Sequence, residues 1–269
     1  MADDLGSVDA LWRYPVKSML GERLEDSPVT PYGLLGDRLF ALRDAEDGKV
    51  ATAKNPRKWP TLFAFAAALA EGADEEAAGV RITLPDGSVI GSDDPTAGRI
   101  LSHALGREVS LERAERGVTQ GVSEAYQADI EEVERRDTVV DFTLPEGTFF
   151  DGAYILLITR ATLAKLSALY PEGRFDERRF RPNLVLDVAG EGFVENTWLG
   201  RTLAIGDEVR LSVIAPCGRC VMTTLPQQDL PRDLGILKTA ARHNGAQVGV
   251  YAAVERGGTV RRGDRVQLE

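Results

Sequence analysis

Short β-prone runs separated by turn residues constrain the fold of this chain more than any other feature of its sequence. Turn signals such as Pro31-Tyr32-Gly33 divide the runs of the first half, and Gly206-Asp207 and Gly257-Gly258 divide those of the second. Regularly spaced short strands with turns between them are typical of sandwiches and barrels. We therefore expect a mainly β fold with some α-helix, closed into barrels. The predicted strands are residues 11–16, 39–43, 80–84, 109–111, 183–188, 208–214, 247–254 and 265–268.

Two segments have the pattern of helices. Residues 159–170 place their leucines on one face, with Thr159 near the start, and residues 230–242 have the pattern of a second short helix. Residues 123–136 mix acidic and basic side chains with few apolar ones, so we interpret them as a solvated surface segment. The Ala-rich tract at residues 64–78 is expected to form a helix or a loop over the first barrel.

The chain shows no internal repeat and no long linker, so its domain organisation rests on a gradual change along the sequence. We place a boundary near residue 112. It divides a domain of residues 1–112 from a domain of residues 113–269.

Composition limits the partners and the compartment. The 269 residues are 43% hydrophobic and 28% charged, which is typical of a globular protein with a sizeable core. A formal charge of −10 disfavours binding to nucleic acid or to an anionic membrane surface. No apolar run has the length of a membrane span and the start lacks a signal-peptide pattern, so we expect a cytoplasmic protein with reduced thiols.

Both cysteines lie in one segment, Cys217-Gly218-Arg219-Cys220. Two thiols, with His103 and His243 far away in the sequence, do not easily complete an iron–sulfur or structural zinc site. The segment can supply soft thiolates beside a guanidinium that lowers their pKa. The alternatives are a buried pair of small side chains and a thioredoxin-type redox pair, although the latter should open a helix and the following residues are β-prone. For Cys217 we expect packing.

Five short motifs together resemble the MOSC family, the C-terminal domain of molybdenum-cofactor sulfurase, preceded by the N-terminal β-barrel domain that often accompanies it. The resemblance spans nearly the whole chain and is especially similar to the mitochondrial amidoxime-reducing components and their bacterial relatives. It implies a MOSC-type β-barrel domain and a smaller N-terminal β-barrel-like domain. The motifs are Tyr14-Pro15-Val16-Lys17-Ser18, Gly36-Asp37-Arg38, Thr52-Ala53-Lys54, Phe180-Arg181-Pro182-Asn183 and Arg219-Cys220.

The resemblance implies a molybdenum cofactor, Mo-molybdopterin, and gives each motif a role. Cys220 is the implied metal ligand, since a thiolate is the soft donor such a metal takes. Asp151 resembles an acidic residue near the metal and is the candidate for proton delivery. The remaining residues suit the anionic and planar parts of the cofactor: Lys17, Ser18 and Arg38 for the phosphate, Arg181 and Asn183 for the pterin edges, and Arg219 for pterin or phosphate beside the thiolate.

Three functions remain open at this point. The first is an oxidoreductase that reduces N-hydroxylated compounds with electrons from a separate donor protein, since the chain ends at Glu269 without a ferredoxin-like domain. The second is a cofactor carrier or sulfur-transfer module that uses a Cys220 persulfide. The third is a binding module that has lost the metal, with Cys220 purely structural. The cofactor interpretation requires Cys220 to share a cavity with Lys17, Arg38 and Arg181.

Overall fold

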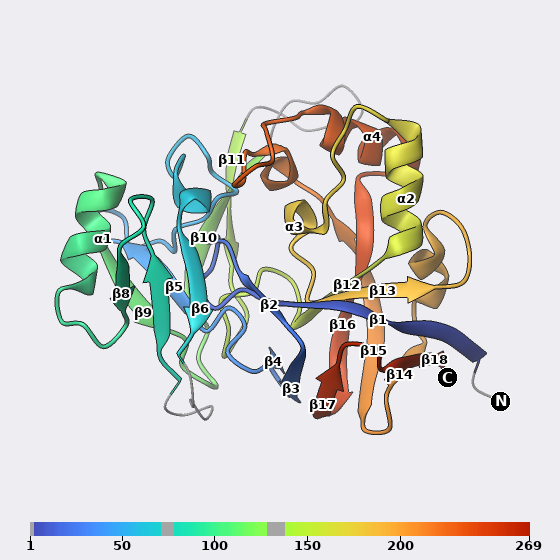
Figure 1. Ribbon diagram of the computed structural model, residues 1–269. Helices are drawn as coiled ribbons and strands as arrows, with labels where there is room; N and C mark the ends of the chain where they lie inside the picture. The colour runs from blue at the N-terminus through green and yellow to red at the C-terminus, as the bar shows by residue number, and fades with distance from the viewer. Residues whose placement is uncertain (1–2, 71–77, 128–137) are drawn as a thin grey trace.

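A computed structural model describes residues 3–70, 78–127 and 138–269 of the chain. Figure 1 shows two halves side by side, with the first half of the chain mostly on the left and a barrel on the right. The two termini lie close together at the barrel, where Asp3 pairs with Leu268.

Seven strands close into a barrel, because the first and the last strand in the hydrogen-bonding order pair with each other. Two neighbouring strands, β12 and β13, are parallel and the other neighbours are antiparallel. The closed barrel predicted for the second half is confirmed. In order, the strands are β13 (Leu184–Val188), β12 (Ile155–Thr159), β16 (Gln247–Arg256), β15 (Val209–Gly218), β14 (Thr202–Ile205), β18 (Arg265–Leu268) and β1 (Asp3–Arg13), and β2 (Glu22–Leu24) extends the sheet from β1.

Strand β1 is therefore part of the barrel that the second half of the chain builds. Its Leu11 pairs with Leu184 and is fully buried in the barrel core with Leu157 and Leu211. The chain leaves the barrel after Arg13, so the loop that follows, residues 14–21, starts at the junction of the two halves. This placement decides where Lys17 and Ser18 lie.

Small antiparallel sheets build the rest of the first half. The sheets are β5 (Phe40–Asp44) with β9 (Val109–Arg113); β6 (Ala66–Leu69), β7 (Val80–Thr83) and β8 (Val89–Gly91); β10 (Val122–Gln127) with β11 (Thr138–Thr143); and β3 (Asp26–Thr30) between β4 (Gly33–Leu34) and β17 (Gly258–Arg261). The sheet of β5 and β9 and the sheet of β6, β7 and β8 pack on a core that contains Trp59, Leu62, Phe65 and Ile82, whereas the sheet of β3, β4 and β17 packs on the barrel core through residues such as Val29.

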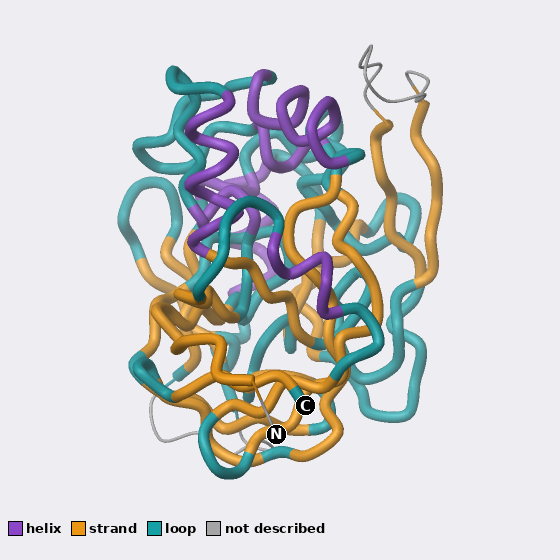
Figure 2. Tube along the Cα trace, turned by 90° about the vertical axis from the view of Figure 1, so that its right-hand side faces the viewer, coloured by secondary structure: helices purple, strands orange, loops and turns teal. Residues whose placement is uncertain are grey.

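Most of the helical segments gather above the strands in Figure 2. Helix α2 (Arg160–Leu169) confirms the first predicted helix, and the Thr159 hydroxyl accepts the N–H of Thr162 at 3.1 Å as its N-cap. Helix α4 confirms the second. The helical elements are α1 (Ala97–Leu105), α2, α3 (Glu177–Phe180), α4 (Gly235–Asn244), and the 3₁₀ turns η1 (Leu62–Ala64), η2 (Val194–Trp198) and η3 (Val221–Thr224).

Several parts of the secondary structure differ from the prediction. Strand β1 begins and ends earlier in the chain than the strand predicted at residues 11–16, and strands β12 and β14 were not predicted. Residues 122–127 form strand β10, in which Ser123 and Glu124 are buried, so the solvated-segment interpretation is wrong there; residues 128–136 lie outside the described part. In the Ala-rich tract, strand β6 replaces the expected helix or loop, because its small residues pair with β7, and residues 71–77 again lie outside. Helix α1 was not predicted. No helix among the described residues is long and apolar enough to span a bilayer.

Candidate functional site

One cavity joins residues from both halves of the chain, and it contains Cys220 together with Lys17, Arg38 and Arg181. The cofactor interpretation required these four residues to share a cavity, and they do. The loops of the first half contribute Lys17, Ser18, Arg38 and Lys54, and the second half contributes Phe149, Phe150, Asp151, Leu156, Arg179, Phe180, Arg181, Cys217, Gly218, Arg219, Cys220, Met222, Thr223 and Tyr251.

Backbone pairing between two loops holds the cationic end of this cavity. The N–H of Lys17 donates to the carbonyl of Phe40 at 2.8 Å, and the N–H of Arg38 donates to that of Tyr14 at 2.8 Å. Five described non-glycine residues have positive φ, and three of them line the cavity: Ser18 at 63°, Arg38 at 47° and Arg181 at 54°. Such conformations are costly and cluster at functional sites.

The buried Lys17 and the half-buried Asp151 and Lys54 form a charge triad. Both lysines are ion-paired with the Asp151 carboxylate, and the distance from Lys54 Nζ to Oδ2 is 3.0 Å. Burial lowers the pKa of Lys17 to about 8 despite the attraction of Asp151. Burial acts to raise the pKa of Asp151, but Lys17 and Lys54 outweigh it and hold that pKa far below its usual range. Asp151 is thus a carboxylate at neutral pH in this arrangement, and the proton of the triad resides on the lysines.

The guanidinium groups of Arg38 and Arg181 form a second part of the site. Arg38 donates to the Asp37 carboxylate and to the carbonyl of Arg181 at 3.1 Å, and Arg181 donates to the carbonyl of Met19 at 2.7 Å. Burial lowers the pKa of Arg181 to about 10, and the charge of Arg38 adds to the effect. Among the described residues, Arg181 uses one of its five N–H donors in a hydrogen bond, so the others can bind a ligand.

Cys220 lies directly before η3 and is half-buried. Burial acts to lower the pKa of Lys54, but attraction to Asp151 and then an electrostatic interaction with Cys220 raise it, so Lys54 is a cation in the same cavity as the sulfur. Arg219 was predicted to contact a ligand and to favour the thiolate. Its guanidinium instead donates to the backbone carbonyls of Val248, at 2.8 Å from Nε, and Phe180, at 3.0 Å.

Cys217 packs in a small core cluster with Phe150 and Leu156 and is 1% exposed. Burial raises the pKa of its thiol, and the Tyr251 hydroxyl is its side-chain hydrogen-bond partner. The thiol is therefore held neutral, in keeping with the packing role expected for it.

The structure does not bring Asn183 into the cavity. Its side-chain carbonyl accepts the N–H of Leu156 at 3.0 Å, and its amide donates to the carbonyl of Trp12 at 3.3 Å, so it joins barrel strands. Asn183 does not line the cavity and both ends of its amide bind the backbone, so this arrangement leaves its predicted pterin contact without support. The backbone conformation of Phe180-Arg181-Pro182-Asn183 determines where the Asn183 side chain lies, and the residue types of this motif do not indicate that conformation.

Two cavity residues were missed as site residues. Lys54 is part of the Thr52-Ala53-Lys54 motif, and its place in this motif was the sequence signal that could have identified it as a site residue. Arg179 is 1% exposed and donates to the carbonyls of Thr223 and Leu225, at 3.1 and 3.3 Å, so it fixes the segment after Cys220. Arg179 is one of several arginines in a charged stretch, and nothing in the sequence distinguishes it from its neighbours for that role.

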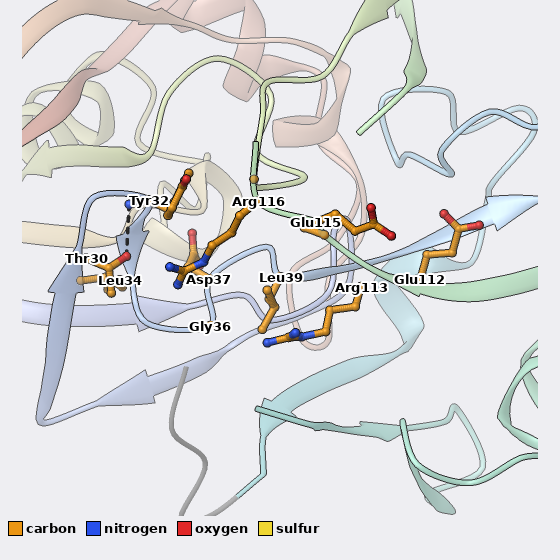
Figure 3. Close-up of a pocket in the computed structure, with 12 residues that line it drawn as sticks. Thr30, Tyr32, Leu34, Gly36, Asp37, Leu39, Glu112, Arg113, Glu115 and Arg116 are labelled. Atoms are coloured by element: carbon orange, nitrogen blue, oxygen red, sulfur yellow. Dashed lines mark hydrogen bonds between the residues drawn. The ribbon is translucent and has the colours of Figure 1, made fainter. Parts of the chain in front are cut away.

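A larger hollow of about 680 Å³ lies next to the site and contains no sulfur (Figure 3). Asp37 lines this hollow while its carboxylate holds Arg38, and Arg116 lies 5.1 Å from the ring centroid of Tyr32. The described residues contain no group of three or more His, Cys, Asp or Glu that could hold a metal ion. His103 and His243 stand at the ends of α1 and α4.

The donor chemistry of the cavity fits an anionic cofactor with a soft metal. Its lining has six cationic side chains and a single carboxylate, in a chain of net charge −10. Buried charges need partners, so this excess predicts an anion. The free volume of about 80 Å³ is below the roughly 300–1,000 Å³ of typical ligand sites. A whole molybdopterin therefore requires side chains that fill the cavity to move.

Comparison with known families agrees with this chemistry. Residues 5–110 match the MOSC N-terminal beta barrel domain, and residues 145–267 match the MOSC domain. The chain thus belongs to the MOSC family and has the N-terminal domain that its motifs indicated.

Curated relatives within this family are similar to most of the chain. It is 27% identical to Mitochondrial amidoxime reducing component 2 of Homo sapiens over 97% of this chain and 83% of the relative. It is 28% identical to Molybdenum cofactor sulfurase of Danio rerio, over 90% of this chain but only 31% of that protein. The crystal structure of the YUAD protein from Bacillus subtilis covers 100% of this chain and 98% of its own, with a TM-score of 0.50 and 12% identity, and so shares the fold.

Proposed function

We propose that this protein binds a molybdenum cofactor and reduces N-hydroxylated compounds with electrons from a separate donor protein. The observation that carries the proposal is the excess of buried cations that shares one cavity with the Cys220 thiol. The names of the amidoxime-reducing relatives support the substrate class. When bound, the cofactor supplies a metal that can accept oxygen from a substrate and cycle between oxidation states.

In this proposal different residues bind different parts of the cofactor. Lys17, Ser18 and Arg38 bind the phosphate, and Arg181 binds the pterin. The Ser18 Oγ accepts the N–H of Ala53 at 3.0 Å, which fixes the oxygen, and the hydroxyl keeps its own hydrogen as a donor for a ligand. Cys220 binds the metal through its thiolate, and Lys54 stabilises negative charge at that end.

Removal of a substrate oxygen as water consumes two electrons and two protons. The charge triad indicates how protons are stored: Asp151 is ionised, and Lys17 and Lys54 carry the protons at neutral pH. Asp151 thus accepts hydrogen bonds and orients the two ammonium groups. In this proposal a lysine is the immediate proton donor, and Asp151 positions it.

Metal and pterin analysis tests the proposal. Full-length protein from a host that makes the cofactor should contain molybdenum and a pterin in proportion to chain, and should reduce an amidoxime with an artificial electron donor. Cys220→Ser should lose the metal-centred activity, and Cys217→Ser is the matched control that should keep the metal. Absence of pterin after anaerobic purification contradicts the proposal.

A second candidate is a cofactor carrier or sulfur-transfer module. The match to molybdenum cofactor sulfurase favours it, and the half-buried Cys220 is accessible enough to hold a persulfide. Mass spectrometry that finds a persulfide on Cys220, or cofactor binding without turnover, would support this function over the reductase.

A further inference from the structure

Aromatic rings and guanidinium groups alternate beside the cationic end of the cavity. The Arg38 Cζ lies 4.2 Å from the ring centroid of Phe150 and 4.4 Å from that of Tyr14. The Arg181 Cζ lies 4.2 Å from the centroid of Tyr14 and 5.5 Å from that of Phe63. Tyr14 is therefore the ring that both guanidinium groups share.

The fold keeps this ring in one place. Tyr14 is 2% exposed, and its backbone N–H donates to the Asp37 carboxylate at 2.8 Å. Gly21 lies against the ring, since a Cβ there would be 2.5 Å from Tyr14 Cδ1 and 2.2 Å from the carbonyl oxygen of Arg13. The absence of a side chain at position 21 leaves room for the ring.

The hydroxyl contributes less to this arrangement than the ring does. The Tyr14 hydroxyl oxygen is buried and has no hydrogen-bond partner among the described residues. Burial raises the pKa of the phenol, so the side chain is neutral. Its π face is the part that interacts with Arg38 and Arg181.

Two like charges in a buried site repel each other, and the charge of Arg38 indeed helps to lower the pKa of Arg181. The negative face of an aromatic ring attracts a guanidinium group, most strongly where water is excluded. One ring that contacts both groups offsets part of their repulsion and restricts their side chains. Arg38 is then oriented for the phosphate, and Arg181 beside it for the pterin, before the ligand arrives.

We propose that Tyr14 is a positioning residue that holds Arg38 and Arg181 for a phosphate-bearing ligand. The inference rests on the proposed function, because it assigns Tyr14 to the anion-binding end of that same site. Tyr14 acts through the two arginines and does not touch the reacting atoms. The ligand chemistry that it serves is a phosphate group, either free or attached to a pterin.

Isothermal titration of inorganic phosphate into full-length protein from a host that lacks the pterin cofactor tests the inference. We expect Tyr14→Leu to weaken phosphate binding about tenfold, since two cation–π contacts are lost. Tyr14→Phe should bind as the wild type does, because the ring remains. Phe65→Leu is the control for loss of a buried ring, since Phe65 is fully buried in the core of the first half.

Pterin content per chain, measured on the same variants from a host that makes the cofactor, is the second readout. It should fall in Tyr14→Leu and stay at the wild-type level in Tyr14→Phe and Phe65→Leu. If Tyr14→Leu does not fold by circular dichroism, Tyr14→Met fills the space without a ring and takes its place.

The outcomes separate the two proposals. Equal phosphate affinity and pterin content in wild type and in the folded ring-less variant overturn the role of Tyr14 and leave the proposed function intact. A wild-type chain that binds neither phosphate nor pterin overturns the proposed function itself.

Discussion

Replacing Lys17 with methionine removes a buried ammonium group and tests the charge triad directly. Burial lowers the pKa of Lys17 to about 8 in the folded chain, from 10.5 in the unfolded one. Between these two pH values the unfolded chain binds more protons than the folded chain, so the free energy of unfolding rises with pH. The gap between the two pKa values corresponds to about 3 kcal/mol.

The quantity to measure is the difference in unfolding free energy between wild type and Lys17→Met, by urea denaturation from pH 7 to pH 10.5. Other titrating groups are common to both chains and largely cancel. The difference should be flat below pH 8 and then rise in favour of the wild type by about 3 kcal/mol. Lys49→Met is the matched control, because Asp141 and Glu124 raise the pKa of Lys49, and its difference should not rise.

A difference for Lys17→Met that stays constant within about 1 kcal/mol, or that falls, would refute the reasoning. Such a result would mean that the ion pair with Asp151 outweighs burial and keeps the pKa of Lys17 at or above its usual value. The proton of the triad would then be held too firmly for the role that we propose for it.

Three further predictions concern the sulfur end and the barrel. Cys220→Ser should lose molybdenum by elemental analysis. Cys217→Ser should retain it and unfold at a lower temperature, since the smaller hydroxyl packs less well in the apolar cluster; the Tyr251 hydroxyl remains as its partner, which limits the cost to about 1 kcal/mol. Asn183→Ala should lower the free energy of unfolding by about 2 kcal/mol, because it leaves a buried N–H and a carbonyl unpaired, with pterin content per folded chain unchanged. Gly249→Ala should destabilise the barrel by more than about 2 kcal/mol in denaturant titration, since φ is 79° and the new Cβ would lie 2.3 Å from the Leu157 carbonyl oxygen. An unfolding midpoint equal to that of the wild type, in Asn183→Ala or in Gly249→Ala, would contradict the contacts described.

Much of the barrel follows from local patterns. Strand β16 and helix α2 were predicted within a few residues, because alternation of apolar side chains and a threonine N-cap are written into neighbouring positions. Strand β10 was missed because its Ser123 and Glu124 are polar residues buried by distant partners, such as Asn55, whose amide donates to Glu124 at 2.9 Å. Burial of that kind depends on long-range contacts.

The sequence by itself determined the family and the chemical inventory of the site. Short motifs keep their residue types and order along the chain, so Lys17, Arg38, Arg181 and Cys220 were identified before any coordinates. The division of the chain near residue 112 remains a prediction. Local sequence patterns contain residue identities and spacings, so they show which chemical groups are present.

The tertiary structure alone decided which of these groups face the cavity. It turned Asn183 out of the cavity toward the backbone, and it kept Arg219 in the lining with its guanidinium bonded to backbone carbonyls. It also placed Lys54 beside Asp151 and Tyr14 between two arginines. The physical reason is that buried polar groups must be paired. Which partner satisfies each group depends on how the barrel and the loops of the first half meet.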